Sequence, residues 1–219
     1  MRNSGRALIV ATLAVGLLGV VGGEAGATHE YIYTPTTTRF FMRNDAPGCP
    51  GTPFLSITAG SGEQSCGYVG GLPYGELSHT GAPVGSTVIT YTARDGVPTY
   101  LDPTRDATGN VTVVATAQTS RMAVGQIIVV VTLKAKSDTG QTIVLGSHSS
   151  EALVNPTNSA ETSFPFTMEM NDAFDKVRLD QVTVDVDIRG WHVLTGFHRL
   201  DGQSFLDLPA YVRTAKPHG

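Results

Sequence analysis

The stretch VTVDVDIR, residues 182–189, decides the fold class of this chain. Its apolar side chains stand at positions 182, 184, 186 and 188, and polar side chains stand between them. In a β-strand successive side chains point to opposite faces, so the alternation produces one apolar and one polar face. The stretch therefore predicts a strand with one face buried and the other in water.

Other runs repeat this pattern along the chain. SFPFTMEM, residues 163–170, has two Phe and two Met on one face, and its Pro165 lacks a ladder N–H, which predicts an edge strand or a bulge. QIIVVVTLKAK, residues 126–136, starts apolar at consecutive positions and predicts a central strand whose first half is covered on both faces. Further strands are expected within residues 37–42, 53–59, 86–93, 110–118 and 141–147.

Turn residues separate these runs, and helical patterns are scarce. SDTG, residues 137–140, is the clearest hairpin signal. Only residues 171–179 suggest a helical turn, with Asn171 or Asp172 as its cap. We therefore predict an all-β fold: a two-sheet antiparallel sandwich, jelly-roll-like, with about ten strands and at most one short helix.

The N-terminus has the three parts of a secretory signal. Arg2 and Arg6 precede an apolar block at residues 7–21, and Ala25-Gly-Ala27 follows as a cleavage site. The block is shorter than the roughly 20 residues of a membrane span, although an uncleaved anchor is the alternative. We expect residues 1–27 to be a signal peptide, residues 28–219 to form a single β-sandwich domain, and the mature protein to be secreted without a membrane span.

Two cysteines, Cys49 and Cys66, are the only ones in the chain. In an exported protein an even number of cysteines at close spacing predicts a disulfide bond. A reactive or metal-binding pair is the alternative, but no CxxC spacing occurs and no histidine lies between them. We expect a disulfide that closes this Gly-rich segment.

The charge distribution argues against nucleic acid as a partner. The formal net charge is −4, and the basic residues are scattered rather than clustered. Binding to nucleic acid needs a basic surface that releases counterions. We expect a polysaccharide or a component of the cell envelope as the partner instead.

Familiar catalytic motifs are missing: the sequence contains no GxSxG, HExxH or GxxxxGK. Ser147 and His148 are neighbours, and neighbours on a strand point to opposite faces. Asp185 and Asp187 share a strand face about 7 Å apart, a spacing compatible with glycoside hydrolysis and equally with a soluble outer face. No catalytic residue is assigned.

Metal and cofactor sites have little support in the sequence. His192 and His198 could meet across a turn, but two imidazoles do not make a zinc site. Either of two acidic loops offers the oxygen ligands that a structural calcium ion uses, and no other cofactor is expected. The candidate calcium ligands are Asn171, Asp172 and Asp175 in one loop and Asp102 and Asp106 in the other.

Carbohydrate recognition on a β-sandwich uses exposed aromatic faces, and one tryptophan stands out for it. Trp191 follows Gly190 at the end of the alternating stretch, so continued alternation puts it on the outer face. A bulge at the glycine would reverse this, and Trp191 would then close one end of the core. The candidate ligand-binding residues are Trp191, Tyr68, Tyr74 and Tyr91, with Tyr100 as a further aromatic.

Several segments resemble a group of secreted bacterial β-sandwich proteins without an assigned activity. They are GCPG at residues 48–51, FLSITAGSG at 54–62, CGYVGGLPYGE at 66–76, YLDPTR at 100–105 and VDIRGWHVLTGFHRLDG at 186–202. The resemblance spans most of the chain after the signal. It implies an exported, jelly-roll-like domain and no site residues.

Three functions are compatible with these observations. The leading one is a secreted, non-enzymatic module that binds carbohydrate or another surface component, an expectation that rests on analogy between folds. The alternatives are an extracellular enzyme acting on polysaccharide and a purely structural envelope protein. Exposed aromatic side chains on one sheet face would favour binding, and two carboxylates facing each other in a cleft would favour the enzyme.

Overall fold

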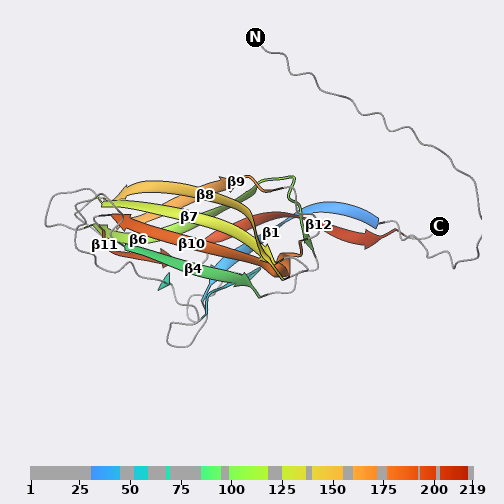
Figure 1. Ribbon diagram of the computed structural model, residues 1–219, viewed down its shortest axis with the longest axis horizontal. Helices are drawn as coiled ribbons and strands as arrows, with labels where there is room; N and C mark the ends of the chain where they lie inside the picture. The colour runs from blue at the N-terminus through green and yellow to red at the C-terminus, as the bar shows by residue number, and fades with distance from the viewer. Residues whose placement is uncertain are drawn as a thin grey trace, which may run out of the picture.

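The structure is a computed structural model, and it describes eleven segments of the chain, all of them β-rich. These are residues 31–44, 52–58, 68–69, 85–94, 99–117, 125–136, 140–154, 160–171, 177–191, 193–200 and 203–216. Their strands are β1 (Tyr31–Arg43), β2 (Phe54–Ser56), β3 (Tyr68–Val69), β4 (Gly85–Ala93), β5 (Tyr100–Leu101), β6 (Ala107–Ala117), β7 (Gly125–Lys136), β8 (Thr142–Val154), β9 (Ala160–Met168), β10 (Val182–Trp191), β11 (Val193–Arg199) and β12 (Phe205–Ala215). The all-β class is confirmed (Figure 1).

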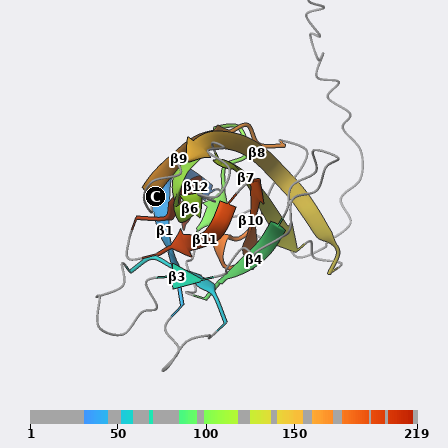
Figure 2. The ribbon, with the colours of Figure 1, turned by 90° about the vertical axis from the view of Figure 1, so that its left-hand side faces the viewer.

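The two-sheet arrangement that we predicted is not confirmed. All twelve strands belong to one hydrogen-bonded sheet in the order β3-β11-β6-β12-β1-β2-β4-β10-β7-β8, with β5 beside β12 and β9 beside β6. The continuity depends on β2, which pairs antiparallel with β1 and parallel with β4. The sheet is therefore mixed rather than purely antiparallel. Seen end on, its strands curl around a common centre (Figure 2).

Contacts between β8 and the end of β9 bring the two outer parts of the sheet together. The Asn171 N–H donates to the Leu145 carbonyl oxygen over 2.7 Å. At Gly146 an added Cβ would lie 2.8 Å from both the Glu169 carbonyl oxygen and the Met168 side chain. This close approach requires a residue without a side chain. The sheet is thus close to a barrel.

The core is built as the alternation in the sequence predicts. Val182, Val184, Val186 and Ile188 of β10 are fully buried, and the Phe and Met side chains of β9 face the same core. Pro165 lies in β9, which pairs only with β6 among the described strands, in agreement with an edge position.

One prediction about β7 is wrong. This strand is central, between β10 and β8, but its burial alternates along its whole length instead of covering both faces of its first half. Ile127 and Val129 are buried, whereas Ile128 and Val130 are only half-buried on the outer face. No second layer covers this outer face within the part of the chain that the structure describes.

Helical structure in the described segments is one 3-10 turn, η2 (Leu179–Gln181), directly before β10. The helical turn expected at residues 171–179 falls largely on residues 172–176, which lie outside the described residues. The Leu179 side chain is buried and fixes η2 to the core. No helix in the described segments is long and apolar enough to cross a membrane.

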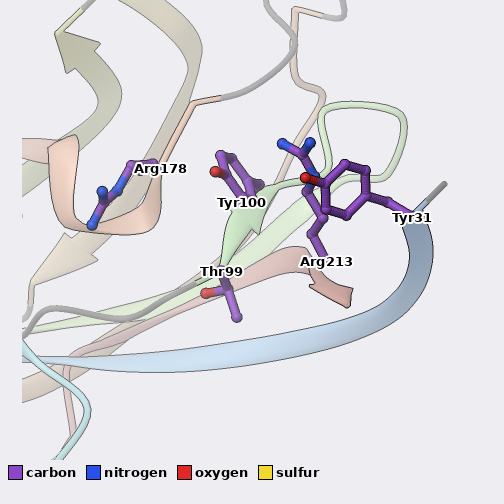
Figure 3. Close-up of a pocket in the computed structure, with 5 residues that line it drawn as sticks. All are labelled: Tyr31, Thr99, Tyr100, Arg178 and Arg213. Atoms are coloured by element: carbon purple, nitrogen blue, oxygen red, sulfur yellow. The ribbon is translucent and has the colours of Figure 1, made fainter. Parts of the chain in front are cut away.

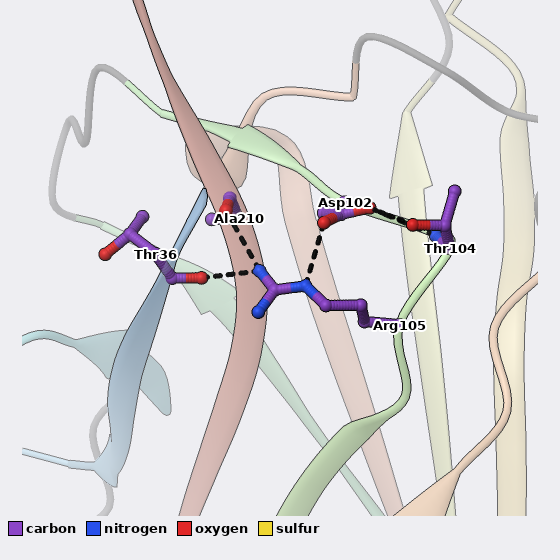
Figure 4. Close-up of polar contacts among 5 residues, drawn as sticks. All are labelled: Thr36, Asp102, Thr104, Arg105 and Ala210. Atoms are coloured by element: carbon purple, nitrogen blue, oxygen red, sulfur yellow. Dashed lines mark hydrogen bonds and ion pairs between the residues drawn. The ribbon is translucent and has the colours of Figure 1, made fainter. Parts of the chain in front are cut away.

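Strands β1 and β12 form a two-stranded ribbon that extends beyond the rest of the sheet (Figure 1). They pair from Tyr31 opposite Ala215 to Phe41 opposite Phe205. Arg105 holds the ribbon from the turn after β5, since its Nη2 donates to the carbonyl oxygens of Thr36 and Ala210 at 2.7 and 3.1 Å (Figure 4).

The turn that carries Arg105 is itself fixed by hydrogen bonds. Arg105 Nε donates to Asp102 Oδ2 over 2.8 Å, and Asp102 Oδ1 accepts from the hydroxyl and the N–H of Thr104 (Figure 4). Partial burial raises the pKa of Asp102, but the hydrogen bonds from Thr104 and Arg105 outweigh it, and the pKa lies below its usual value. The charged form of Asp102 therefore holds the arginine that ties the ribbon down.

Candidate functional site

Most of the aromatic residues singled out from the sequence cannot be placed. Tyr74 lies outside the described residues, and so do the side chains of Tyr68 and Trp191. The backbone of Trp191 pairs with Gln126 of β7, and the preceding Gly190 is buried. Both placements considered for the Trp191 side chain, on the outer face or closing one end of the core, stay predictions. Cys49 and Cys66 also lie outside the described residues, so the disulfide stays a prediction as well.

Tyr91 is not an exposed aromatic residue. It lies on β4 opposite Val184 of β10, and its side chain is 0% exposed. Burial raises the pKa of its hydroxyl well above the usual value. The structure therefore corrects its assignment as a ligand-binding residue: its ring belongs to the core.

A pocket of about 350 Å³ lies where the β1–β12 ribbon meets β5 and the segment before η2. Its lining combines two tyrosine rings, two guanidinium groups and the hydroxyl of a threonine (Figure 3). The lining residues are Tyr31, Thr99, Tyr100, Arg178 and Arg213. Ligand pockets in proteins have volumes of about 300–1,000 Å³, so this one is large enough for a small polar ligand or one residue of a polymer.

Backbone pairing fixes the floor of the pocket. Tyr100 pairs with Tyr211 of β12 on one side and forms a bridge with Arg178 on the other. The Leu101 N–H donates to the Val177 carbonyl at 2.7 Å, and the Leu179 N–H donates to the Thr99 carbonyl at 3.1 Å. Three extended segments thus lie side by side.

Alternation along these segments decides which side chains reach the pocket. Thr99, Leu101, Val177 and Leu179 are buried, whereas Tyr100 and Arg178 between them are not. Because neighbours on an extended chain point to opposite faces, the buried residues turn Tyr100 and Arg178 outward. The buried neighbours of Tyr100 and Arg178 therefore fix the backbone of both residues against the core.

A row of tyrosine rings runs from the pocket along the ribbon. Tyr100 stacks on Tyr211, with the ring centroids 5.6 Å apart and the planes 15° apart. Tyr33 meets Tyr211 edge-on at 5.3 Å, and the Tyr33 side chain is 57% exposed. These four rings, Tyr31, Tyr33, Tyr100 and Tyr211, are called the tyrosine row below. They offer an aromatic surface next to a polar pocket.

The two arginines of the pocket differ in their partners. Arg178 forms two hydrogen bonds to the Asp180 carboxylate, at 3.0 and 2.6 Å. The Arg213 guanidinium lies over the Tyr31 ring, with Cζ 3.5 Å from the ring centroid. Among the described residues Arg213 has no carboxylate partner. Stacking leaves the N–H groups at the edge of a guanidinium available for other acceptors.

Thr99 supplies a polar atom without a partner at the floor of the pocket. The residue is only 8% exposed, and its Oγ1 makes no hydrogen bond within the described structure. Buried hydroxyl groups in proteins are almost always hydrogen-bonded, so an unpaired one needs an explanation. In the view of Figure 3 the hydroxyl points to the side on which Arg178 lies.

Sequence reasoning found only Tyr100 of this site. Tyr31 and Tyr33 share a face of β1, and their spacing of two residues was the local signal that could have drawn attention to them. Arg213 lies opposite Tyr33 in the ribbon but 180 positions later in the sequence. No local pattern reveals such a pairing.

The carboxylates proposed for glycoside hydrolysis are engaged elsewhere. Asp185 accepts hydrogen bonds from Thr90 and Lys134, and Asp187 accepts from Arg189. Both lie on the outer face of β10, where they serve as ion-pair partners. Both hydrogen bonds from Arg189 go to Asp187 Oδ2, and Asp187 Oδ1 makes no hydrogen bond within the described structure. The contacts therefore explain both carboxylates as ion-pair partners and assign neither a catalytic role.

The other candidates for chemistry are also placed in part. His148 contacts Ser150, with Nε2 and Oγ 3.0 Å apart, and Ser147 lies on the other face beside Thr132. His192, Asp172 and Asp175 lie outside the described residues. Within the described ranges no three His, Cys, Asp or Glu side chains gather as a metal site.

Comparisons with known proteins add little to this geometry. No protein-family model matches the chain, and no curated protein matches it. A solved family 11 carbohydrate-binding module from Clostridium thermocellum, in complex with a β-1,3-1,4-mixed-linked tetrasaccharide, is 10% identical. The match covers 89% of this chain and 94% of that one, with a TM-score of 0.26.

Two structures of infectious bursal disease virus are similar to the same degree. The Gt strain gives 9% identity and a TM-score of 0.28, and the Gx strain gives 12% and 0.26. The matches cover 84% and 89% of this chain but only 58% and 59% of the viral chains. TM-scores this low carry no argument about fold or function. The chain is thus assigned to the all-β class by its own strands, and the site is interpreted from its own residues.

Proposed function

We propose that the protein is a secreted, non-enzymatic binding module for carbohydrate, and that it binds its ligand in the pocket at the base of the ribbon. Export after a cleaved signal, a single domain over residues 28–219 and a disulfide between Cys49 and Cys66 belong to the same proposal. So does the jelly-roll-like description of the fold. The jelly-roll-like description is supported by the core, because inward side chains of β10 pack in one cluster with those of β6 and β12.

The observation that carries the proposal is the combination of the tyrosine row with the polar pocket. Sugars present apolar C–H faces and hydroxyl edges, and binding sites for them need both an aromatic surface and hydrogen-bonding groups. Tyr100 and Tyr31 provide the rings, and Arg178, Arg213 and Thr99 provide the polar groups. The site is open at the surface, so it can accept one unit of a longer chain.

Pre-organisation strengthens this interpretation. Tyr100 is held by Tyr211 on its ring and by β12 and Arg178 along its backbone. An aromatic side chain that is already fixed loses little entropy when a ligand stacks on it. The rings therefore form a rigid surface rather than a set of independent side chains.

The test is binding of the mature protein to a panel of soluble neutral and acidic polysaccharides, measured by affinity electrophoresis and isothermal titration calorimetry. Tyr100→Ala removes the central ring of the pocket and should weaken binding about tenfold or more, a loss typical of an aromatic anchor. Trp191→Ala is the matched control, because it removes the aromatic residue that the sequence alone favours.

The outcomes separate the two candidate surfaces. Loss of binding in Tyr100→Ala with retention in Trp191→Ala supports the pocket. The reverse result moves the site to the end of β10. If no polysaccharide binds the wild-type protein, the carbohydrate function is wrong. Circular dichroism and thermal melts of both variants verify that each one is folded.

A further inference from the structure

We propose that the pocket selects acidic carbohydrate, and that Arg213 and Arg178 bind a carboxylate on the sugar residue that stacks on the tyrosines. This inference rests on the proposed function and names the ligand class for the same site. It follows from the charge of the lining, the free N–H groups of Arg213 and the unpaired hydroxyl of Thr99.

The charge of the lining is the first argument. The described residues that line the pocket include two arginines and no carboxylate, and the nearby Asp180 is paired with only one of the two. The chain as a whole carries a formal net charge of −4, so this local excess of positive charge runs against the protein's average. Because like charges in a shared pocket repel each other, an arrangement of two guanidinium groups is stabilised when an anion binds between them.

Arg213 provides the second argument. Its guanidinium stacks on Tyr31 with Cζ 3.5 Å from the ring centroid, which fixes the plane of the group. Among the described residues no carboxylate pairs with it. A planar guanidinium held this way presents parallel N–H donors that fit a carboxylate bidentately.

Arg178 differs because it already holds an acid, Asp180, with both oxygens. That pairing positions the guanidinium and partly neutralises its charge. In the view of Figure 3, Arg178 and the Arg213–Tyr31 pair lie on opposite sides of Tyr100. Both cations line the pocket in which a sugar ring stacked on Tyr100 would lie, and Arg213 is the stronger anion site because its charge is not offset.

Thr99 supplies the third and independent argument. Its Oγ1 is buried without a hydrogen-bond partner in the described structure, at the floor of the pocket. A hydroxyl can donate to a carboxylate or exchange hydrogen bonds with a sugar hydroxyl. Thr99 is among the lining residues, so a ligand that reached its Oγ1 would satisfy the group.

The test compares acidic polysaccharides with uncharged forms of the same polymers. Polygalacturonate, alginate and hyaluronan are each titrated in native form and as the methyl ester, which keeps the sugar and removes the charge. The native form of at least one polymer should bind about tenfold or more tightly than its ester, because charge-assisted hydrogen bonds are the strong ones. This difference should shrink as salt is added.

Variants assign the effect to named side chains. Arg213→Gln should lower the affinity for the acidic polymer to that for its ester and change ester binding by about twofold or less. Tyr100→Ala should weaken both forms. Arg189→Gln is the matched control, because Arg189 is an ion-paired surface arginine that does not line the pocket, and it should change neither.

Each result decides between the proposals. Equal binding of the native polymers and their esters overturns the selection of acidic sugars and leaves the carbohydrate function standing. Acidic selection that survives Arg213→Gln and also Arg178→Gln shows that the carboxylate is not bound in this pocket. If neither form binds but neutral polysaccharides of the wider panel do, the acidic inference fails alone. If nothing binds, the proposed function fails with it.

Discussion

Replacing Gly109 by alanine tests how tightly the sheet is packed where β6 changes partners. Gly109 pairs with Leu206 of β12 on one side and with Phe166 of β9 on the other. An added Cβ would lie 2.5 Å from Phe166 Cζ and 2.5 Å from the carbonyl oxygen of Phe205. Both atoms would have to move by roughly 1 Å to reach a normal contact of about 3.5 Å.

The two clashes are not equally easy to relieve. The Phe166 ring can tilt, although it is buried in the core. The Phe205 oxygen belongs to the backbone of β12, whose residues pair with β6 and with β1 at the same place. Overpacking of this kind costs about 1–3 kcal/mol, and the loss of glycine's freedom in the unfolded chain returns about 0.4–1 kcal/mol. Because one clash is with backbone that cannot move independently, we expect a cost near the upper end of this range and a net destabilisation of about 2 kcal/mol.

Thermal and urea unfolding followed by circular dichroism measure this effect. For a chain of this size about 2 kcal/mol corresponds to a Tm lowered by roughly 4–8 °C. The matched variants are Phe166→Leu and the double variant Gly109→Ala/Phe166→Leu. Because the alanine methyl fills part of the space that the ring leaves, the double variant should be more stable than the sum of the single effects by about 1 kcal/mol.

Two results would refute the reasoning. A Gly109→Ala protein as stable as the wild type would show that β6 and β12 do not approach this closely. Strict additivity in the double variant would show that the ring of Phe166 does not cover Gly109, and the destabilisation would then come from the backbone oxygen alone.

Four further predictions concern stability. Arg105→Met removes the side chain that ties the ribbon to the turn after β5, and it should lower the free energy of unfolding by about 1 kcal/mol and speed amide hydrogen exchange in β1. Unchanged exchange would contradict the role of this contact. The folded-state pKa of Asp102 lies below its unfolded value near 3.8, so its contribution is complete above that pH and is lost as the pH falls through the folded pKa. In acid titrations the stability difference between the wild type and Arg105→Met should therefore narrow at low pH, and the part due to the bonds from Arg105 to the Thr36 and Ala210 carbonyls should remain. Ile188→Ala empties a fully buried position of β10 and should lower the free energy of unfolding by about 2–5 kcal/mol with an unchanged urea m-value. Reduction of the expected bond between Cys49 and Cys66, detected by mass spectrometry as a gain of two thiols, should cost roughly 3 kcal/mol, and thiols that are free without reductant would disprove the bond.

The sequence predicts the parts of this fold that depend on local alternation. The buried face of β10 and the four buried Phe and Met side chains of residues 164–170 follow directly from the period of two. The burial of Tyr91 was readable in the same way, since Ile89 and Tyr91 share a face of β4 and Val88 lies on the other, which is exposed. The prediction for Tyr91 considered its polar aromatic side chain alone and not its position in the alternation of β4, which places it in the core.

Arrangements that depend on distant pairing were beyond the sequence. The three residues of β2 pair antiparallel with β1 and parallel with β4, and so join β1 and β4 into one sheet. A strand this short leaves no periodic signal in the sequence. The pocket has the same origin, because its residues come from the beginning, the middle and the end of the chain. Tyr100 was noticed as an aromatic side chain, but its neighbours became visible only through the ladders on both sides of β5.

The direct pairing of Tyr31 with Ala215 has a mechanical consequence. Tension applied through the two ends of the described chain acts on adjacent residues of one antiparallel ladder, so the ribbon opens one hydrogen-bonded pair at a time instead of resisting as a whole in shear. The first pairs to open carry Tyr31, Tyr33 and Arg213. A protein stretched between two attachments would therefore open the proposed binding pocket before the curled body of the sheet begins to unravel.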